Sequence, residues 1–295
     1  MKQFQLQWLI DEHSNEKTIK QFLSEQKISK TALTDIKFNG GDILINGEHV
    51  TVLHRLQLGE VLTVIFPKEE ISEQMKPETI PLEIVFEDEY LLVVNKPAGM
   101  NTIPSREHPT GSLANALLGY FSQEQLSQTI HIVTRLDRDT SGLVLIAKHR
   151  HIHHLFSLMQ RKNEVKRMYE ALCVGTLEVE KGTINAPIAR KADSIIERCV
   201  ADDGQIAITH YEVIKEYNGY SHIRLRLETG RTHQIRVHLS YLGHPLLGDT
   251  LYGGHKDCIH RQALHCSYLQ FIHPITNEKI EINIPLEKDL FRLVR

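Results

Sequence analysis

Residues 131–148 read HIVTRLDRDTSGLVLIAK, a polar, charged half followed by an apolar half. The apolar run from Leu143 to Ala147 predicts a short buried strand. Thr140-Ser141-Gly142 comes just before it and predicts a turn, in which glycine adopts backbone angles that other residues avoid. Ionisable side chains on a rigid scaffold are often placed for chemistry, although a salt-bridged surface turn is the alternative. We therefore expect a tight, charged loop at the mouth of the strand, formed by Arg135, Asp137, Arg138 and Asp139.

The composition limits the classes of protein to consider. The chain has 295 residues, of which 41% are hydrophobic and 24% charged, as in one or two globular domains. A formal net charge of -3 gives no overall basic field, so a nucleic-acid partner must be argued from local clusters. We expect a cytoplasmic protein without membrane contact, because no apolar run approaches the roughly 20 residues of a membrane span. The four cysteines are widely spaced, which favours reduced thiols over disulfides or a zinc site.

Residues 1–67 are predicted to form a small separate unit. The segment 4–10 alternates like a strand, 18–26 has helical spacing, and Ser29 offers an N-cap for a second helix. Asn46-Gly47 predicts a hairpin, and 61–66 predicts a further strand. This order resembles an S4-type RNA-binding domain. A small packing or interaction domain is the alternative, because acidic and basic residues are nearly balanced in this unit.

Residues 68–81 predict a linker, since they contain two prolines and many charged residues and lack an apolar period. The remaining chain, 82–295, is predicted to be one larger domain. In it, 149–162 has helical spacing and a basic face flanked by Lys148 and Arg150, which suits a phosphate backbone. His149, His151, His153 and His154 raise a metal alternative. We expect no metal, because no carboxylate or cysteine is placed to complete a site.

Two later segments carry further candidate residues. Tyr169 lies within a strand predicted over 165–174, either as a core residue with a hydrogen-bonded hydroxyl or as an aromatic platform for a base. After an irregular segment at 190–200 and paired strands at 205–213 and 221–227, Thr232 is predicted to cap a helix. Arg231 begins this helix and Arg236 lies inside it. A partly buried arginine needs an anionic partner, and Asp137 is a candidate.

Three blocks, in this order, resemble the RluA-type RNA pseudouridine synthases: RLDRDTSGLVLIAK at 135–148, VKRMYEALCVG at 165–175 and LETGRTHQIRVHLSYLGHPLLGDTLYG at 227–253. NKPAGM at 95–100 and ALHCSYLQFIHPIT at 263–276 accompany them. The resemblance runs from about residue 82 to the end. It implies an α+β fold with a central mixed, largely antiparallel sheet flanked by helices, in addition to a small α/β S4-like N-terminal domain.

The resemblance implies that uridine is isomerised to pseudouridine in structured RNA without a cofactor or metal. Asp137 matches the family's aspartate, the nucleophile or base that acts at the ribose while uracil leaves through N1, rotates and rejoins through C5. Tyr169 matches the tyrosine that stacks on the base and assists deprotonation at C5. Arg236 matches the arginine that pairs with the aspartate and keeps it ionised. Arg135 matches the arginine that helps to flip the target nucleotide.

The resemblance also implies a wider RNA contact surface. We expect it to include Arg167, Arg231, Lys148 and Arg150. Two positions depart from the family pattern: Thr134 stands where histidine is common, and Arg167 stands where lysine is usual before Tyr169. Arginine keeps the charge of lysine but not its shape.

Family habit makes ribosomal RNA, or its precursor, the first expected substrate and transfer RNA the second, for a monomeric enzyme. Two other functions compete. Asp137-Arg138-Asp139-Thr140 fits the Asp-x-Asp-x-Thr pattern of Mg²⁺-dependent aspartyl-phosphate phosphatases. That pattern should follow a full hydrophobic strand near the start of a doubly wound domain, whereas here it lies in mid-chain. The other alternative is a non-catalytic ribosome-assembly factor on a synthase scaffold.

Overall fold

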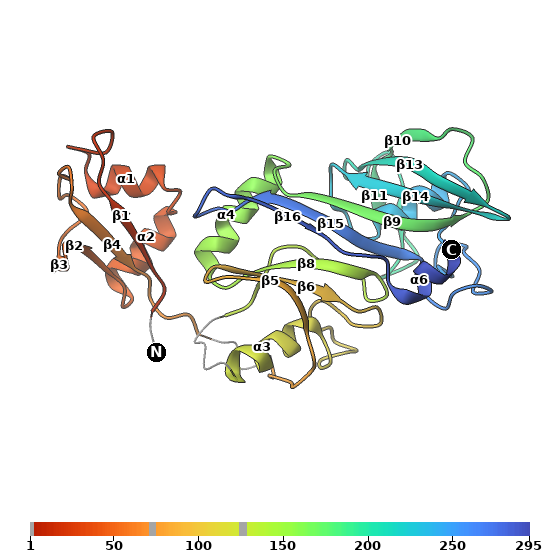
Figure 1. Ribbon diagram of the computed structural model, residues 1–295, viewed down its shortest axis with the longest axis horizontal. Helices are drawn as coiled ribbons and strands as arrows, with labels where there is room; N and C mark the ends of the chain where they lie inside the picture. The colour runs from red at the N-terminus through yellow and green to blue at the C-terminus, as the bar shows by residue number, and fades with distance from the viewer. Residues whose placement is uncertain (1–2, 71–74, 124–128) are drawn as a thin grey trace.

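A computed structural model describes residues 3–70, 75–123 and 129–295. A ten-stranded sheet forms its larger part (Figure 1). Its strands are β5 (Glu83–Glu87), β6 (Leu91–Lys96), β7 (His131–Ile132), β8 (Ser141–Ala147), β9 (Lys166–Val174), β10 (Lys181–Asn185), β13 (Ile208–Tyr217), β14 (Tyr220–Leu227), β15 (Leu264–Ile272) and β16 (Lys279–Asn283).

The strand order is β10-β13-β14-β9-β15-β8-β6-β5, with β16 paired to β15 and β7 paired to β8. Among the described residues, every pairing in this sheet is antiparallel except that of β15 with β8. The predicted mixed, largely antiparallel sheet is therefore confirmed.

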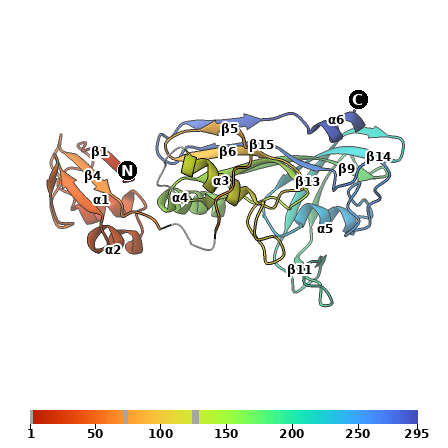
Figure 2. The same cartoon turned by 90° about the horizontal axis from the view of Figure 1, so that it is seen from below.

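Helices cover one side of this sheet. Figure 2 shows α3 (Leu113–Gln123), α4 (Arg150–Arg161) and α5 (Gln234–Tyr241) on the same side, whereas α6 (Lys288–Leu293) lies near the C-terminus. Every residue of β8 is buried, and its apolar side chains join those of β6, α3 and α4 in one core. The buried strand predicted at Leu143–Ala147 is thus confirmed.

The turn before β8 is tied to β15. Thr140 N–H donates to the carbonyl of Asp137 over 3.1 Å and closes a turn over 137–140, whereas Ser141 and Gly142 of the predicted turn already belong to β8. Gly142 has φ +115°, and a Cβ at this position would lie 2.3 Å from the carbonyl oxygen of Cys266. Only glycine lets β8 and β15 approach this closely in that conformation. The charged loop is therefore fixed to the middle of the sheet.

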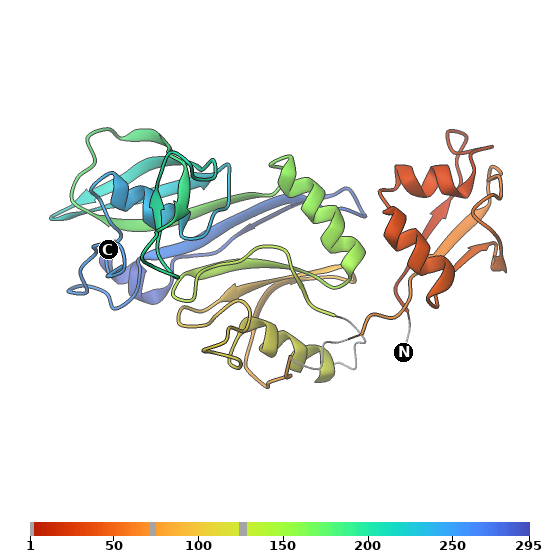
Figure 3. The same cartoon turned by 180° about the vertical axis from the view of Figure 1, so that it is seen from behind.

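The N-terminal residues form a separate four-stranded sheet in the order β1-β4-β2-β3, with its own hydrophobic core. Ser29 caps the second helix, as predicted from sequence, and Thr18 caps the first, which was not predicted. In Figure 3 this unit stands beside the larger sheet. Its elements are β1 (Gln5–Leu9), α1 (Ile19–Glu25), α2 (Lys30–Phe38), β2 (Asp42–Ile45), β3 (Glu48–His49) and β4 (Val61–Ile65).

Part of the expected linker makes specific contacts. Glu69 is largely buried, pairs with His131 over 2.6 Å and accepts a hydrogen bond from the backbone N–H of Arg150 over 2.8 Å. Residues 71–74 lie outside the described residues. The division into domains at 1–67, 68–81 and 82–295 stays a prediction.

Two local expectations were wrong. Residues 190–200 are not wholly irregular, because β11 (Ile188–Arg190) and β12 (Arg198–Val200) pair in a small sheet. These strands are too short to show an alternating pattern. Thr232 is not the cap of α5: His233 is the N-cap, in a left-handed conformation and without a side-chain cap bond.

Candidate active site

A cavity of about 680 Å³ lies where the loop before β8 meets β9 and the start of α5. Six of the eight residues expected to contact substrate or catalyse the reaction line it: Arg135, Asp137, Arg167, Tyr169, Arg231 and Arg236. Residues 133–137, 165–169 and 227–236 thus come from distant parts of the sequence to one place. This convergence makes the cavity the candidate active site.

The backbone on both sides of Asp137 is held by buried donors. Lys96 has no exposed surface, and its Nζ donates to the carbonyls of Pro97, Met100 and Arg138 over 2.9, 2.8 and 3.1 Å. Thr102 Oγ1 donates to the carbonyl of Leu136 over 2.7 Å. Burial lowers the pKa of Lys96 to about 8, although the nearby Asp137 and Asp139 carboxylates oppose this shift. The loop is therefore preorganised before any substrate arrives.

Arg236 joins Asp137 to a second carboxylate. Its Nη1 donates to Asp137 Oδ2 over 3.1 Å, which confirms the pair expected from sequence. Its Nε and Nη2 form a bidentate pair with the buried Asp249, over 2.7 and 2.8 Å. Burial alone would lower the pKa of Arg236, but the hydrogen bonds and charge of Asp249, aided by Asp137, outweigh it and raise the pKa. The guanidinium is a fixed positive charge beside Asp137.

Sequence reasoning missed three residues around this pair. Asp249 lies in the glycine-rich loop that follows α5. Its negative charge was the only feature of the sequence that could have marked it as a partner of Arg236. The Tyr252 ring lies 4.9 Å below the guanidinium of Arg236. Its hydroxyl accepts from the backbone N–H of Arg198 over 2.9 Å and lies 2.8 Å from Nδ1 of His233. The Nε2 atom of His233 is 3.9 Å from Asp137 Oδ2.

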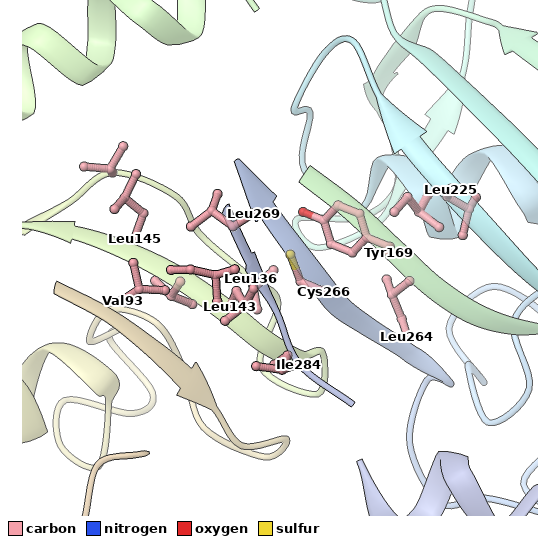
Figure 4. Close-up of a cluster of buried hydrophobic side chains, with 14 of the residues drawn as sticks. Val93, Leu136, Leu143, Leu145, Tyr169, Leu225, Leu264, Cys266, Leu269 and Ile284 are labelled. Carbon is pink, nitrogen blue, oxygen red and sulfur yellow. The ribbon is translucent and has the colours of Figure 1, made fainter. Parts of the chain in front are cut away.

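Tyr169 belongs both to the core and to the cavity. It lies on β9 opposite Leu225 of β14 and Cys266 of β15, and Figure 4 shows the three side chains together. Its hydroxyl accepts a hydrogen bond from Arg167 Nη1 over 3.0 Å. Burial strongly raises the pKa of Tyr169, although Arg167 opposes the shift. The phenol is therefore neutral near pH 7.

The other predicted RNA contacts divide into two groups. Arg135 and Arg231 are exposed at the cavity, and Arg231 Nε donates to the carbonyl of Ile206 over 3.0 Å. Lys148 and Arg150 do not line the cavity. The buried Lys148 ammonium pairs with Glu87 over 2.7 Å. Arg150 pairs with Asp35 of the N-terminal unit over 3.1 Å.

The histidines at the start of α4 have structural partners. His149 accepts from the backbone N–H of His151 and stacks on Phe4 with the ring centroids 4.0 Å apart. Within the described part of the chain, no three histidine, cysteine, aspartate or glutamate side chains are grouped to hold a metal. In the same ranges, none of the helices has the length and apolar character needed to cross a membrane.

Comparison with known proteins agrees with this site. Residues 90–241 match the RNA pseudouridylate synthase family. The chain is 52% identical to the uncharacterized RNA pseudouridine synthase YjbO of Bacillus subtilis (strain 168), over 94% of this chain and 98% of the relative. It is 39% identical to the ribosomal large subunit pseudouridine synthase D of Vibrio parahaemolyticus, over 85% of this chain and 81% of the relative.

A solved structure shares the fold. The structure of human RNA pseudouridylate synthase domain containing 1 superposes with a TM-score of 0.59 at 28% identity. The superposition covers 72% of this chain and 86% of the human one. The full-length sequence relatives and this structural likeness agree with the converging motifs at the cavity. This chain belongs to the RNA pseudouridylate synthase family and is an RNA pseudouridine synthase.

Proposed function

We propose that this enzyme isomerises specific uridines of ribosomal RNA, with Asp137 acting at the ribose of a flipped-out nucleotide. A relative named for the large ribosomal subunit supports ribosomal RNA over transfer RNA as the substrate. The exposed arginines at the cavity suit a phosphate backbone, although the net charge of the chain is -3.

The arrangement of Asp137 and Arg236 is the observation that carries the mechanism. The Asp137 side chain is 28% exposed at the cavity, whereas Arg236 behind it is 8% exposed. Arg236 contacts only Oδ2 of Asp137, and the described residues give Oδ1 no hydrogen-bond partner. Oδ1 is therefore the oxygen open to the substrate. A carboxylate so placed can attack the anomeric carbon or remove a proton beside it.

Tyr169 is proposed to stack on the uracil after the bond between N1 and the ribose breaks. Its neutral phenol is a weak base, so the raised pKa favours a stacking role over unaided proton removal at C5. Arg167 holds the hydroxyl and limits rotation of the ring. Uracil then rotates against a fixed surface and rejoins the ribose through C5, which releases any bond from the ribose to Asp137; C5 loses its proton and N1 takes one up. The product has the same composition as the substrate.

The remaining RNA contacts are also proposals. We place Arg135 in nucleotide flipping, because it is exposed beside Asp137 and lines the same cavity. Arg167 and Arg231, which line the same cavity, are also proposed to contact the RNA. Lys148 and Arg150 already have carboxylate partners, which weakens the case for their direct RNA contact. An S4-like N-terminal domain that binds RNA, action as a monomer and a cytoplasmic location remain predictions.

The decisive experiment compares two aspartates of one loop. Total RNA from cells lacking the protein, and from cells complemented with wild type, Asp137→Asn or Asp139→Asn, is mapped by carbodiimide modification and primer extension. We expect wild type and Asp139→Asn to restore the missing stops in ribosomal RNA, and Asp137→Asn to restore none. Stops restored by Asp137→Asn would refute the catalytic role of Asp137. Primer-extension stops that change only in transfer RNA would refute ribosomal RNA as the substrate.

The same variants test the competing functions. A non-catalytic assembly factor would support ribosome assembly equally well as wild type and as Asp137→Asn, with no pseudouridine depending on either. The phosphatase alternative would require Mg²⁺-dependent activity on phosphate esters. The largely antiparallel sheet is not the doubly wound domain that this motif requires, so the phosphatase hypothesis is wrong.

A further inference from the structure

His233 has an unusual backbone conformation at the edge of the candidate active site. Its φ of 57° and ψ of 19° are left-handed, although it is neither glycine nor asparagine. Such a conformation costs on the order of 1–3 kcal/mol and persists only when the surroundings maintain it. The histidine does not offset this cost by capping α5, since its side chain makes no cap bond. The conformation instead directs the imidazole toward Asp137.

Tyr252 fixes which nitrogen of the imidazole carries the proton. The Tyr252 hydroxyl accepts from the backbone N–H of Arg198, so its own proton is available for Nδ1 of His233, 2.8 Å away. A neutral imidazole that accepts at Nδ1 carries its proton on Nε2. The Nε2–H group is then the one nearest Asp137 Oδ2, at 3.9 Å.

The charges around His233 agree with a neutral ring. Burial is the largest influence and lowers the pKa of His233. Asp137 opposes this shift, the positive charges of Arg236 and Arg198 add to it, and Asp249 opposes it weakly. Nε2 is therefore a neutral donor beside the carboxylate rather than a second cation.

We propose that His233 is a positioning residue that holds Oδ2 of Asp137 together with Arg236, so that Oδ1 faces the ribose. This inference rests on the proposed role of Asp137. The 3.9 Å separation is longer than a hydrogen bond. Catalytic hydrogen bonds in unliganded sites are often long and shorten when substrate binds. Arg236 cannot follow a rotation of the carboxylate, because Asp249 holds its other two nitrogens. His233 supplies the second restraint.

The tautomer is tested first, in the folded wild-type enzyme. Long-range nitrogen–proton correlation spectra distinguish a protonated Nδ1 from a protonated Nε2. We expect His233 to be protonated at Nε2 alone in the wild type. In Tyr252→Phe, which keeps the aromatic ring beside Arg236 but removes the hydroxyl, we expect a mixture of the two His233 tautomers. A wild-type signal from protonated Nδ1, or no change in Tyr252→Phe, overturns the proposal whatever the variants at position 233 do.

Two substitutions at His233 then separate positioning from folding. His233→Asn tolerates the left-handed backbone but has no donor at the Nε2 position, whereas His233→Gln restores a donor there. In single-turnover assays on an RNA containing a mapped site, we expect His233→Asn to slow the reaction about ten- to a hundredfold with RNA affinity nearly unchanged. His233→Gln should recover most of that rate.

Asp137→Asn separates this inference from the proposed function. An inactive Asp137→Asn with a fully active, folded His233→Asn would refute the role of His233 and leave Asp137 in place. An active Asp137→Asn would refute both the catalytic role of Asp137 and the positioning role of His233. Equal loss of rate in His233→Asn and His233→Gln, with matching loss in the midpoint of thermal unfolding, would show that His233 acts only in folding.

Discussion

The guanidinium of Arg236 is shared unequally between two carboxylates. Asp249 receives two hydrogen bonds and is 1% exposed, whereas Asp137 receives one and is 28% exposed. The bidentate pair fixes the plane of the guanidinium, and Nη1 is left to contact the reactive carboxylate. Asp249 therefore sets the position of Arg236, while Arg236 orients Asp137.

Removing the charge of Asp249 should disturb both stability and catalysis. We expect Asp249→Asn to lower the free energy of unfolding by about 3 kcal/mol, because it leaves a buried guanidinium with one remaining carboxylate. It should also slow single turnover about a hundredfold, as the guanidinium shifts. Urea unfolding and single-turnover kinetics measure the two effects.

Asp289→Asn is the matched control for this prediction. Asp289 also forms a bidentate pair with an arginine, Arg261, but its side chain is 41% exposed. Its loss should cost at most about 1 kcal/mol. Equal costs for Asp249→Asn and Asp289→Asn would contradict the assigned importance of burial.

Only part of the site was predictable at the level of residues. Asp137 and Arg236 stand in motifs and carry opposite charges, so their pairing could be proposed from sequence. Asp249 and His233 gave no comparable signal. Their roles depend on the path of the loop after α5 and on a left-handed backbone at His233, neither of which follows from residue spacing.

Strand β8 and its parallel partner β15 hold the loop that carries Asp137 in a fixed position on the sheet. Gln262 Nε2 donates to Thr140 Oγ1 over 2.9 Å, and Arg261 Nη1 donates to the carbonyl of Asp139 over 3.2 Å. The loop that carries Asp137 is thus supported by residues just before β15. Displacing β15 from β8 would move the carboxylate.

Gly142→Ala tests this close approach. An added Cβ would overlap the backbone of Cys266, and φ at this position is +115°. We expect the free energy of unfolding to fall by at least about 3 kcal/mol. Gly219→Ala is the control, because Gly219 has φ +88° but nothing within 4 Å of an added Cβ. It should cost about 1 kcal/mol. Equal losses in urea unfolding would contradict the packing argument.

The start of α4 should make stability depend on pH. Burial lowers the pKa of His149 to about 3, although Glu69 opposes this shift. Between about pH 6.5 and that value, the unfolded chain binds a proton that the native chain does not, so the free energy of unfolding decreases as the pH is lowered. His149→Asn keeps an acceptor for the cap and should reduce this slope by about one proton, or about 1.4 kcal/mol per pH unit.

Unfolding free energies measured from pH 4 to 7 check the prediction, with His108→Asn as the control. His108 is exposed and should leave the slope unchanged. An unchanged slope in His149→Asn would show that this ring is protonated in the native state.

The periodicity of apolar residues was enough to predict most elements. The strand at Leu143–Ala147 and the cap at Ser29 follow from local chemistry. Strands β11 and β12 were missed, because three residues are too few to show a period. The parallel pairing of β8 with β15 could not be derived either, since no local pattern specifies which distant strand becomes the neighbour.

At the scale of the whole molecule, RNA binding must depend on where positive charge lies rather than on its total. The net charge is -3, and several basic side chains are already paired with carboxylates. We expect the salt dependence of RNA affinity to be shallow and to arise largely from the arginines at the cavity.

Arg135→Gln should lower the slope of the logarithm of affinity against the logarithm of salt concentration by about one. Lys148→Gln should leave that slope unchanged, because its ammonium is already paired with Glu87. Filter binding from 50 to 300 mM salt, on one mapped RNA, measures both. A smaller slope in Lys148→Gln but not in Arg135→Gln would reverse the assignment of these two residues.

The pairing of β8 with β15 has a consequence for protein synthesis. Ser141 Oγ lies 2.9 Å from His265 Nδ1 although 124 positions separate them in the chain. At about 5–20 residues per second, the ribosome delivers β15 roughly ten seconds after β8. During that interval the nascent chain contains the reactive loop but not the support from Arg261 and Gln262, and Ser141 and Gly142 of β8 lack their partners on β15. Catalytic competence therefore arises late in translation, once β15 has paired with β8.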